Sequence, residues 1–277
     1  MARFDLSWRS IDEESRPGAI QMALEEVAAS RVADGGDALV RTFRWDPSTL
    51  SMGYGQSAET VDWMFCETEG IEVTRRRTGG GGIYHDHDAD LSYSIVVPAD
   101  AVAGDLLTAY HTLCEPVLEF FDRLGIEADY ASGTHEAIYE PACFLRDIHP
   151  AHDILVAGRK ICGNAQYRQQ DAVIQHGSIL FDRATASHLG VFDDASVSPS
   201  TFEHRTTTIT DHAEVERREA VSLLADTLRT WAGADPGSWT GDELEAAATL
   251  AERKYAAAAW VGGSSGSDGM PTRTDHR

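Results

Sequence analysis

The spacing of apolar residues predicts a helix near the beginning of the chain. After Pro17 and Gly18, apolar side chains recur at helical intervals, and the pattern ends before Gly35. A proline is tolerated in the first turn of a helix, because the N–H that it lacks would have no helical partner there. A second stripe of apolar side chains predicts a helix over residues 105–124.

Seven short segments are rich in β-forming residues and predict strands. In one of them, Leu91, Tyr93 and Ile95 alternate with serines, which is typical of a half-buried strand. The dipeptide Ala157-Gly158 predicts a tight hairpin turn between two others. The segments are residues 38–45, 49–52, 71–77, 91–98, 153–156, 160–167 and 172–180.

Two further helices are expected, over about residues 213–232 and 241–259. Helices and strands are mixed without regular βαβ alternation, which favours an α+β fold over a doubly wound sheet. We expect one domain over residues 1–261. The Gly- and Ser-rich segment 262–277 is expected to be a disordered tail.

Composition narrows the functions that this fold could serve. The 277 residues carry a formal net charge of −22, which argues against binding to nucleic acid or to an anionic membrane. Only two of the 23 basic residues are lysines, and such an acidic, lysine-poor composition indicates adaptation to high salt. The sequence has no CxxC pair, signal segment or apolar run long enough to span a membrane, so we expect a cytoplasmic protein with free thiols.

Three arginines and four glycines form the most distinctive segment. Residues 75–77 are all arginine, and residues 79–82 are all glycine. Consecutive glycine amides can turn toward one ligand and bind an anion, and the arginines would add positive charge. The segment lacks the spacing of a P-loop or of a dinucleotide-binding fold. We therefore expect a phosphate or carboxylate site of another kind.

The histidines and aspartates that follow do not predict a metal site. His85 and His87 are two residues apart and could point the same way, but no distant set of ligands completes a site. We expect this segment, residues 85–90, to be a polar rim beside the pocket.

Two residue types suggest catalysis. Lys160 is one of only two lysines, and an amine can shift its pKa and exchange a proton in a way that a guanidinium cannot. Cys143 precedes a cluster of groups at Asp147, His149, His152 and Asp153 that could assist a thiol, and a nearby ammonium would lower its pKa.

The other cysteines are weaker candidates for a nucleophile. Cys162 lies two residues from Lys160 and is a rival to Cys143, although it stands among packing residues. Cys66 and Cys114 lie in helical patterns and are expected to be buried, which is the usual place of a lone cysteine.

Several segments together resemble the signatures of the lipoate-protein ligase and octanoyltransferase superfamily (biotin/lipoate A/B protein ligases). They are residues 43–45, 51–56, 75–86, 158–166 and 175–180, together with Lys254, Tyr255 and Trp260. The resemblance extends over about residues 15–260. The acidic composition further suggests a haloarchaeal member.

The resemblance implies a mixed β-sheet catalytic domain flanked by helices, with short C-terminal helices. Such a domain attaches a lipoyl or octanoyl group to a lysine of a lipoyl carrier domain, in a 2-oxoacid dehydrogenase E2 subunit or the glycine cleavage H protein. Lys160 is expected to contact the acyl carbonyl. The implied substrate-binding residues are Arg75, Arg76, Arg77, Gly79, Gly80, Gly81, Gly82, Tyr84, His85, Gly163, Asn164, Ala165, His176 and Gly177.

Two mechanisms within this superfamily remain open. A transferase would carry the acyl group as a thioester on Cys143, stabilise the oxyanion with Lys160 and the glycine amides, and need no cofactor. A ligase would use ATP and Mg²⁺ to form an acyl-adenylate and would need a separate accessory subunit. The position of Cys143 before Lys160 favours the transferase.

A third hypothesis is a non-catalytic module that binds lipoyl or biotin groups. Its usual companion is a basic helix-turn-helix that binds DNA, and the acidic N-terminal segment contains none. The presence of both Cys143 and Lys160 favours an enzyme.

Overall fold

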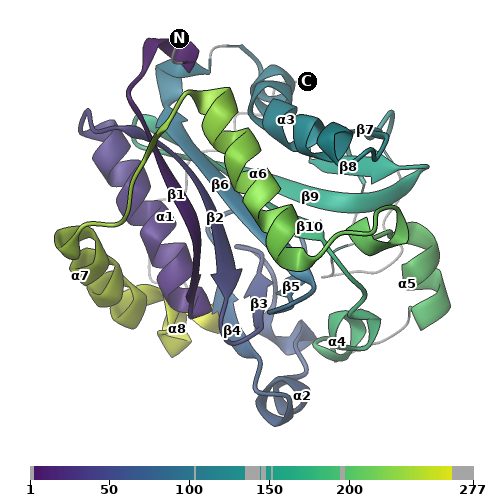
Figure 1. Ribbon diagram of the computed structural model, residues 1–277. Helices are drawn as coiled ribbons and strands as arrows, with labels where there is room; N and C mark the ends of the chain where they lie inside the picture. The colour runs from purple at the N-terminus through teal and green to yellow at the C-terminus, as the bar shows by residue number, and fades with distance from the viewer. Residues whose placement is uncertain are drawn as a thin grey trace.

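The structure is a computed structural model that describes residues 3–102, 104–134, 144, 148–150, 152–193 and 197–263 (Figure 1). The expected nucleophile Cys143 lies outside the described residues. So does the expected tail, apart from Gly262 and Gly263.

The chain forms eleven described strands and eight described α-helices. The strands are β1 (Trp8–Arg16), β2 (Ala38–Trp45), β3 (Thr49–Met52), β4 (Glu72–Arg75), β5 (Ile83–His85), β6 (Asp90–Pro98), β7 (Ala128–Tyr130), β8 (Asp153–Val156), β9 (Arg159–Gln169), β10 (Ala172–Leu180) and β11 (Asp235–Pro236). The helices are α1 (Gly18–Ala33), α2 (Trp63–Thr68), α3 (Leu106–Arg123), α4 (Thr185–Gly190), α5 (Pro199–Arg205), α6 (Arg217–Ala232), α7 (Gly241–Leu250) and α8 (Ala258–Val261).

Eight of the strands form one mixed sheet, in the order β11-β1-β2-β6-β10-β9-β8-β7. β1 is parallel to both of its neighbours, and the other pairs are antiparallel. A second, three-stranded sheet has the order β4-β3-β5. The predicted α+β fold with a mixed sheet and flanking helices is therefore confirmed.

Helices cover both faces of the large sheet. On one face, α3 and α6 pack on the sheet around a core that includes Tyr93, Ile95 and Phe121; α6 crosses the front of the sheet in Figure 1. On the other face, α1 packs with α7 around Leu24 and Val96. The small sheet forms a third core with α2 and α4.

Because helices cover both faces of the large sheet, the prediction for β6 is wrong. The alternation in β6 suggested a half-buried strand, but β6 is buried on both faces from Asp90 to Val97. Its serines face the second core and are satisfied there: Ser92 accepts a hydrogen bond from Trp45 Nε1 (2.8 Å), and Ser94 accepts one from Arg41 Nε (2.8 Å). Buried hydroxyls with such partners give the same sequence pattern as exposed ones.

Strands β2, β3, β8 and β10 match the predicted segments residue for residue. The hairpin between β8 and β9 is also confirmed, and both turn residues have positive φ (Ala157, 49°; Gly158, 77°). Strand β1 was missed because its acidic residues obscure the apolar pattern. Two of them pair with arginines, Glu13 with Arg217 and Glu14 with Arg16.

The predicted helix 241–259 is wrong as a single element. Helix α7 ends at Leu250, a π-helical turn follows over Ala251–Tyr255, and α8 begins at Ala258. The tertiary contacts of the turn account for the break, because Tyr255 O accepts from Thr74 Oγ1 (2.9 Å) and Tyr255 OH donates to Glu26 (2.6 Å). The predicted helix 213–232 begins later, at Arg217.

Candidate active site

A narrow cavity with about 20 Å³ of free space lies between the large sheet, the small sheet and α1. This free space holds about one water molecule, far less than the roughly 300–1,000 Å³ of small-molecule sites. Apolar and glycine residues form half of the cavity lining, and polar side chains form the other half. The lining residues are Met22, Phe43, Trp45, Ser51, Arg76, Ile83, His85, Ser92, Gly163, Asn164, Ala165, His176, Gly177 and Ser178.

Seven of the expected substrate-binding residues line this cavity. Strand alternation decides which residues of β5 do so, because Ile83 and His85 point to the cavity and Tyr84 points to the opposite side. The Tyr84 hydroxyl instead donates to Asp86 Oδ2 (2.8 Å). The seven are Arg76, His85, Gly163, Asn164, Ala165, His176 and Gly177.

The glycine loop lies at the edge of the small sheet. Gly79 and Gly80 are exposed and Gly81 and Gly82 are buried, and Gly80 has a φ of 90° that favours glycine. A Cβ on Gly53 would lie 2.0 Å from Gly80 O, so the two backbones approach closely. Within the described chain, none of the four loop amides donates a hydrogen bond. These amides can therefore donate to an oxygen-bearing ligand.

Arg75, the first arginine of the run, is buried, and its hydrogen bonds join three chain segments. The Arg75 guanidinium donates to the carbonyls of Gly53 (2.8 Å) and Gln56 (2.7 Å) in the loop after β3. It also donates to the carbonyls of Trp260 (2.9 Å) and Val261 (2.7 Å) in α8. Its role in this structure is to hold the loop against the C-terminal helix.

The other two arginines have different surroundings. Arg76 is buried and donates to Ser51 O (2.6 Å) and Gly81 O (2.7 Å), so it orders the glycine loop from inside the cavity. Arg77 is partly exposed and pairs with Glu26 (3.2 Å). It lines a second hollow that shares only Met22 and His176 with the cavity.

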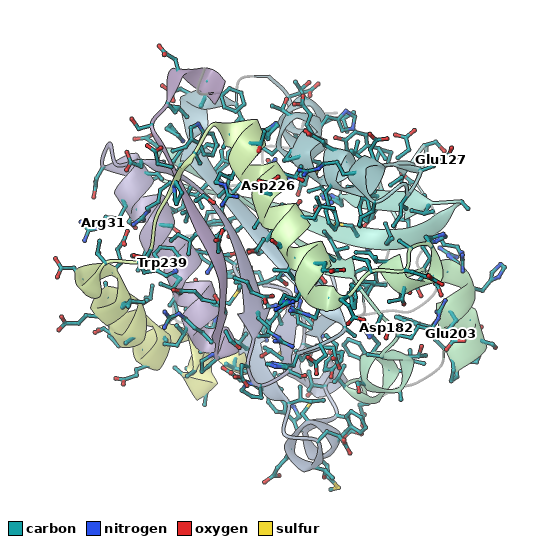
Figure 2. All side chains as sticks on the ribbon, viewed as in Figure 1. Arg31, Glu127, Asp182, Glu203, Asp226 and Trp239 are labelled. Atoms are coloured by element: carbon teal, nitrogen blue, oxygen red, sulfur yellow. The ribbon has the colours of Figure 1, made fainter. Side chains whose placement is uncertain are left out.

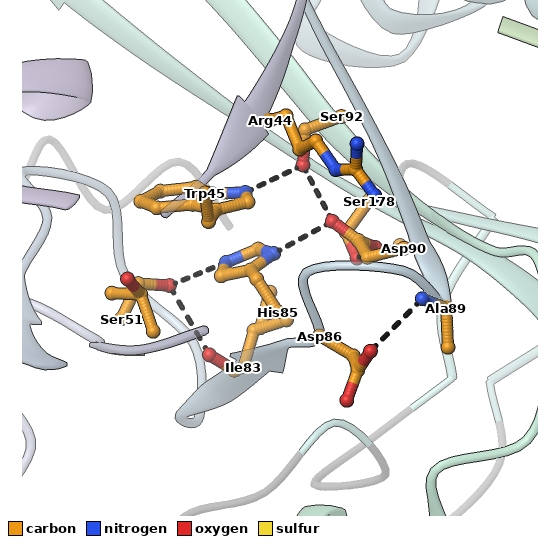
Figure 3. A network of polar contacts seen from close by, with 12 residues as sticks. Arg44, Trp45, Ser51, Ile83, His85, Asp86, Ala89, Asp90, Ser92 and Ser178 are labelled. Atoms are coloured by element: carbon orange, nitrogen blue, oxygen red, sulfur yellow. Dashed lines mark hydrogen bonds and ion pairs between the residues drawn. The ribbon is translucent and has the colours of Figure 1, made fainter. Parts of the chain in front are cut away.

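A buried polar network forms one wall of the cavity (Figure 3). His85 Nδ1 lies 3.1 Å from Asp90 Oδ2, and His85 Nε2 lies 2.9 Å from Ser51 Oγ. The Asp90 carboxylate also accepts from Ser92 (2.6 Å) and Ser178 (2.5 Å). Burial lowers the pKa of His85, so the ring is neutral near neutral pH.

The tautomer follows from this network. The Asp90 carboxylate can only accept, so His85 carries its proton on Nδ1 and Nε2 accepts from the Ser51 hydroxyl. The Trp45 ring stacks on His85 with centroids 4.1 Å apart. His85 is therefore a buried part of the wall and Asp90 is buried behind it, which corrects the expectation that the whole segment 85–90 forms a polar rim.

A second set of hydrogen bonds holds the His176 ring in place. Its Nδ1 lies 2.8 Å from Glu25 Oε2, and its Nε2 lies 3.1 Å from Thr78 Oγ1. Burial would raise the pKa of Glu25, but the charges and hydrogen bonds of His176 and Arg41 outweigh it and lower that pKa. The imidazole is thus held in one orientation at the boundary between the two hollows.

Lys160 is buried beside the cavity. Its Nζ forms an ion pair with Asp153 Oδ1 (2.6 Å) and donates to Phe144 O (2.8 Å). A Cβ on Gly163, which lines the cavity, would lie 3.3 Å from Nζ. Among the described residues these are the two polar contacts of the ammonium, and Nζ also lies 4.2 Å from the centroid of the Phe144 ring.

The described cysteines are buried and poorly suited to nucleophilic attack. Cys66 and Cys114 are buried as expected, and burial raises their thiol pKa values to about 11 and about 12. Cys162, the rival to Cys143, is also fully buried, and burial raises its pKa well above the usual range. A thiol with a raised pKa is protonated near neutral pH, so Cys162 is a poor nucleophile.

Sequence reasoning missed several residues of the site. Phe43, Trp45 and Ser51 lie in segments that carried the resemblance, but nothing in the sequence placed them in the wall. Met22 gave only a helical apolar pattern. Asp153 was noted as a partner for a thiol, whereas the structure pairs it with Lys160.

The described residues contain neither a metal-ligand cluster nor a membrane-spanning helix. No group of three or more His, Cys, Asp or Glu side chains lies together as metal ligands would. No described helix combines the length and the apolar character that crossing a membrane requires.

Comparison with known proteins defines the class. Residues 17–229 match the model of the lipoyl protein ligase A/B catalytic domain family. This match covers more than half of the chain, so the chain belongs to that family, as its motifs predicted. Its relatives include octanoyltransferase LipM of Kyrpidia tusciae, which is 31% identical over 92% of this chain and 98% of the relative. Octanoyltransferase LipM of Carboxydothermus hydrogenoformans is 36% identical over 63% of this chain, and the chain spans 65% of that relative's length.

Solved structures agree with the fold. A lipoate-protein ligase A bound with ATP superposes with a TM-score of 0.77 at 25% identity, over 93% of this chain and 99% of the other. A structure of an archaeal lipoylation system from Thermoplasma acidophilum, a bipartite lipoate protein ligase and its E2 lipoyl domain, gives a TM-score of 0.78 at 22% identity. That match covers 95% of this chain and 99% of the other.

Proposed function

We propose that this chain is an acyltransferase of protein lipoylation. It would take an octanoyl or lipoyl group from a donor thioester and attach it to a lysine of a lipoyl carrier domain. The observation that carries the proposal is the buried Lys160 ammonium, held by Asp153 and Phe144 next to Gly163 in the wall of the narrow cavity. The relatives named octanoyltransferase support the same activity.

The proposed reaction has two acyl transfers. The Cys143 thiolate attacks the donor carbonyl, and the donor thiol leaves with the proton that Cys143 gave up. The amine of the carrier lysine then attacks the Cys143 thioester, an amide forms, and the proton lost by the amine restores the Cys143 thiol. In the sequence, Cys143 precedes Phe144, whose carbonyl accepts from Lys160. This adjacency supports Cys143 as the residue that carries the acyl group.

Lys160 and the glycine loop would stabilise the negative oxygen in both steps. Among the described residues the ammonium has two polar partners, and the amides of residues 79–82 have no acceptor. Hydrogen-bond donors that are already in position before the reaction stabilise the transition state most where water is excluded, typically by about 3 kcal/mol per donor. The other expected substrate-binding residues would hold the acyl chain or, like Arg75, the loop.

An ATP-dependent lipoate ligase is the second candidate, and the likeness to a ligase structure bound with ATP favours it. The arginine run is a poor match for the phosphates of ATP. Arg75 and Arg76 donate to the protein's own carbonyls, and Arg77 pairs with Glu26, so a triphosphate would find these cations already occupied. This arrangement supports the transferase, which needs neither ATP nor Mg²⁺.

The deciding experiment separates the two routes. The protein is incubated with an octanoyl thioester and a lipoyl domain, and in parallel with lipoate, ATP and Mg²⁺. We expect product from the thioester without ATP, an octanoyl adduct on the chain by intact mass, and loss of both in Cys143→Ala. Cys162→Ala is the matched control and should retain the adduct. Product that requires ATP and survives Cys143→Ala would establish the ligase instead.

The proposed partners follow from the proposed acyl transfer. They are lipoyl domains of 2-oxoacid dehydrogenase E2 subunits or the glycine cleavage H protein, and an accessory subunit would be needed only for the ligase. We also propose that the protein is cytoplasmic and works at high salt. Its net charge of −22 makes its acidic residues repel one another, and salt screens this repulsion.

A further inference from the structure

A hollow on the surface beside Lys160 carries positive charge in a chain that is otherwise strongly acidic. It lies where the turn between β8 and β9 meets α5, at the right-hand edge of Figure 1. We call it the basic hollow, and it is open to solvent. Its lining residues are Ala157, Gly158, Arg159, Ser200, Glu203, His204 and Arg205.

The two arginines of the basic hollow have no partner in the described chain. Neither Arg159 nor Arg205 forms a side-chain hydrogen bond or an ion pair with another described residue, and Arg205 Nη2 is buried without an acceptor. A buried guanidinium N–H without an acceptor is unfavourable, because it has lost its hydrogen bonds to water. The one acid in the lining, Glu203, accepts from Thr185 Oγ1 (2.9 Å).

Arginines elsewhere in the chain are commonly neutralised. Nine of them form ion pairs with carboxylates, whereas Arg159 and Arg205 form none with a described residue and lie together in one hollow. The nine are Arg9, Arg16, Arg41, Arg44, Arg77, Arg123, Arg183, Arg217 and Arg229.

The basic hollow is connected to the candidate active site through the backbone. Arg159 directly precedes Lys160, and Arg205 directly precedes Thr206. Lys160 and Thr206 pair in a β-bridge, and Thr207 N donates to Lys160 O (3.0 Å). A molecule that binds in the hollow therefore rests on the two segments that position Lys160.

We propose that the basic hollow is the docking surface for an acidic face of the lipoyl domain that accepts the acyl group; this rests on the proposed function. Guanidinium groups form bidentate hydrogen bonds with carboxylates, and an open hollow suits a protein surface with several of them. A protein with a net charge of −22 repels an acidic partner at long range, so local unneutralised arginines are needed to orient one.

The test measures binding of the full chain to a lipoyl domain, at low and at high ionic strength. Arg159→Glu and Arg205→Glu should each weaken the affinity roughly tenfold and reduce its dependence on salt. Arg159→Gln and Arg205→Gln should give smaller losses in the same direction, with an unfolding midpoint equal to that of the wild type.

Arg31→Glu is the matched control, because Arg31 is exposed, forms no ion pair in the described chain, and lies on the opposite side of the molecule from Glu203 (Figure 2). It makes the same change of charge and should leave the affinity unchanged. Unchanged binding in Arg159→Glu and Arg205→Glu would overturn the proposal. So would an equal loss in Arg31→Glu, which would indicate only a general effect of charge.

A second measurement keeps the two proposals apart. Intact mass after incubation with a small octanoyl thioester reports the adduct on Cys143 and does not involve docking. The docking proposal expects equal adduct in the wild type, Arg159→Glu and Arg205→Glu. If the wild type forms no adduct, the thioester mechanism fails, while the binding data still decide the docking surface.

Discussion

At the scale of single residues, the candidate site depends on a few close contacts around Lys160. The ammonium fits against Gly163, and its ion pair with Asp153 is buried. The sequence marked Lys160 because lysine is rare in this chain and marked Gly163 through a family motif. It could not assign Asp153 to Lys160, because a bulge between β8 and β9 sets this pairing.

Gly163→Ala should reduce catalysis more than ligand binding. The added Cβ would lie 3.1 Å from Lys160 Cε and 3.2 Å from Phe144 Cε2, so the lysine must move by a few tenths of an ångström. We expect kcat for acyl transfer to fall by about 10–100-fold, because reacting groups tolerate little misplacement.

The control for this prediction is Gly241→Ala on α7, where a Cβ meets no atom within 4 Å. Its kcat should equal that of the wild type. A Gly163→Ala protein with normal kcat and weakened acyl binding would place Gly163 in the binding wall alone.

At the scale of elements, the glycine loop is shaped by a segment far away in the sequence. Arg75 ends β4, and its guanidinium joins the loop after β3 to α8. The sequence predicted that the arginine run and the glycines would form one anion site. The structure gives the arginines separate roles, because alternation along the chain directs neighbouring side chains to different surroundings.

Arg75→Met should destabilise the protein and loosen its C-terminal segment. The substitution leaves several buried carbonyls without a donor, and each such group costs roughly 1–3 kcal/mol. We expect the free energy of unfolding to fall by at least about 3 kcal/mol in denaturant titrations, with faster proteolysis near α8.

Arg218→Met provides the comparison for this loss, because Arg218 is exposed and forms no ion pair with a described residue. It should unfold at the wild-type denaturant concentration. Equal stability of Arg75→Met and Arg218→Met would mean that the carbonyls around Arg75 find other donors.

At the scale of the whole molecule, burial determines how stability depends on pH. Burial lowers the pKa values of His85 and His188 below the usual 6.5. His188 Nε2 is buried without a hydrogen-bond partner in the described chain. Between the lowered pKa and about 6.5, the unfolded chain binds protons that the folded chain does not, so stability rises with pH across this interval.

Stability should therefore be full above about pH 6.5 and should decrease as the pH falls below it. The expected loss is about 1.4 kcal/mol for each unit by which a pKa is lowered. Denaturant unfolding at a series of pH values measures it. His188→Phe removes one of the two groups and should reduce the slope, and an unchanged slope would assign the acid sensitivity to other groups.

The sequence by itself determined the fold class, the family and most strand positions, because apolar periodicity and motif spacing are local properties of the chain. It also selected Lys160 and half of the residues that prove to line the cavity. Only the tertiary structure decided that Arg75 fastens a loop, that Tyr84 points away from the cavity, and that β6 is buried on both faces. These features depend on contacts between segments distant in the sequence, which no local pattern records.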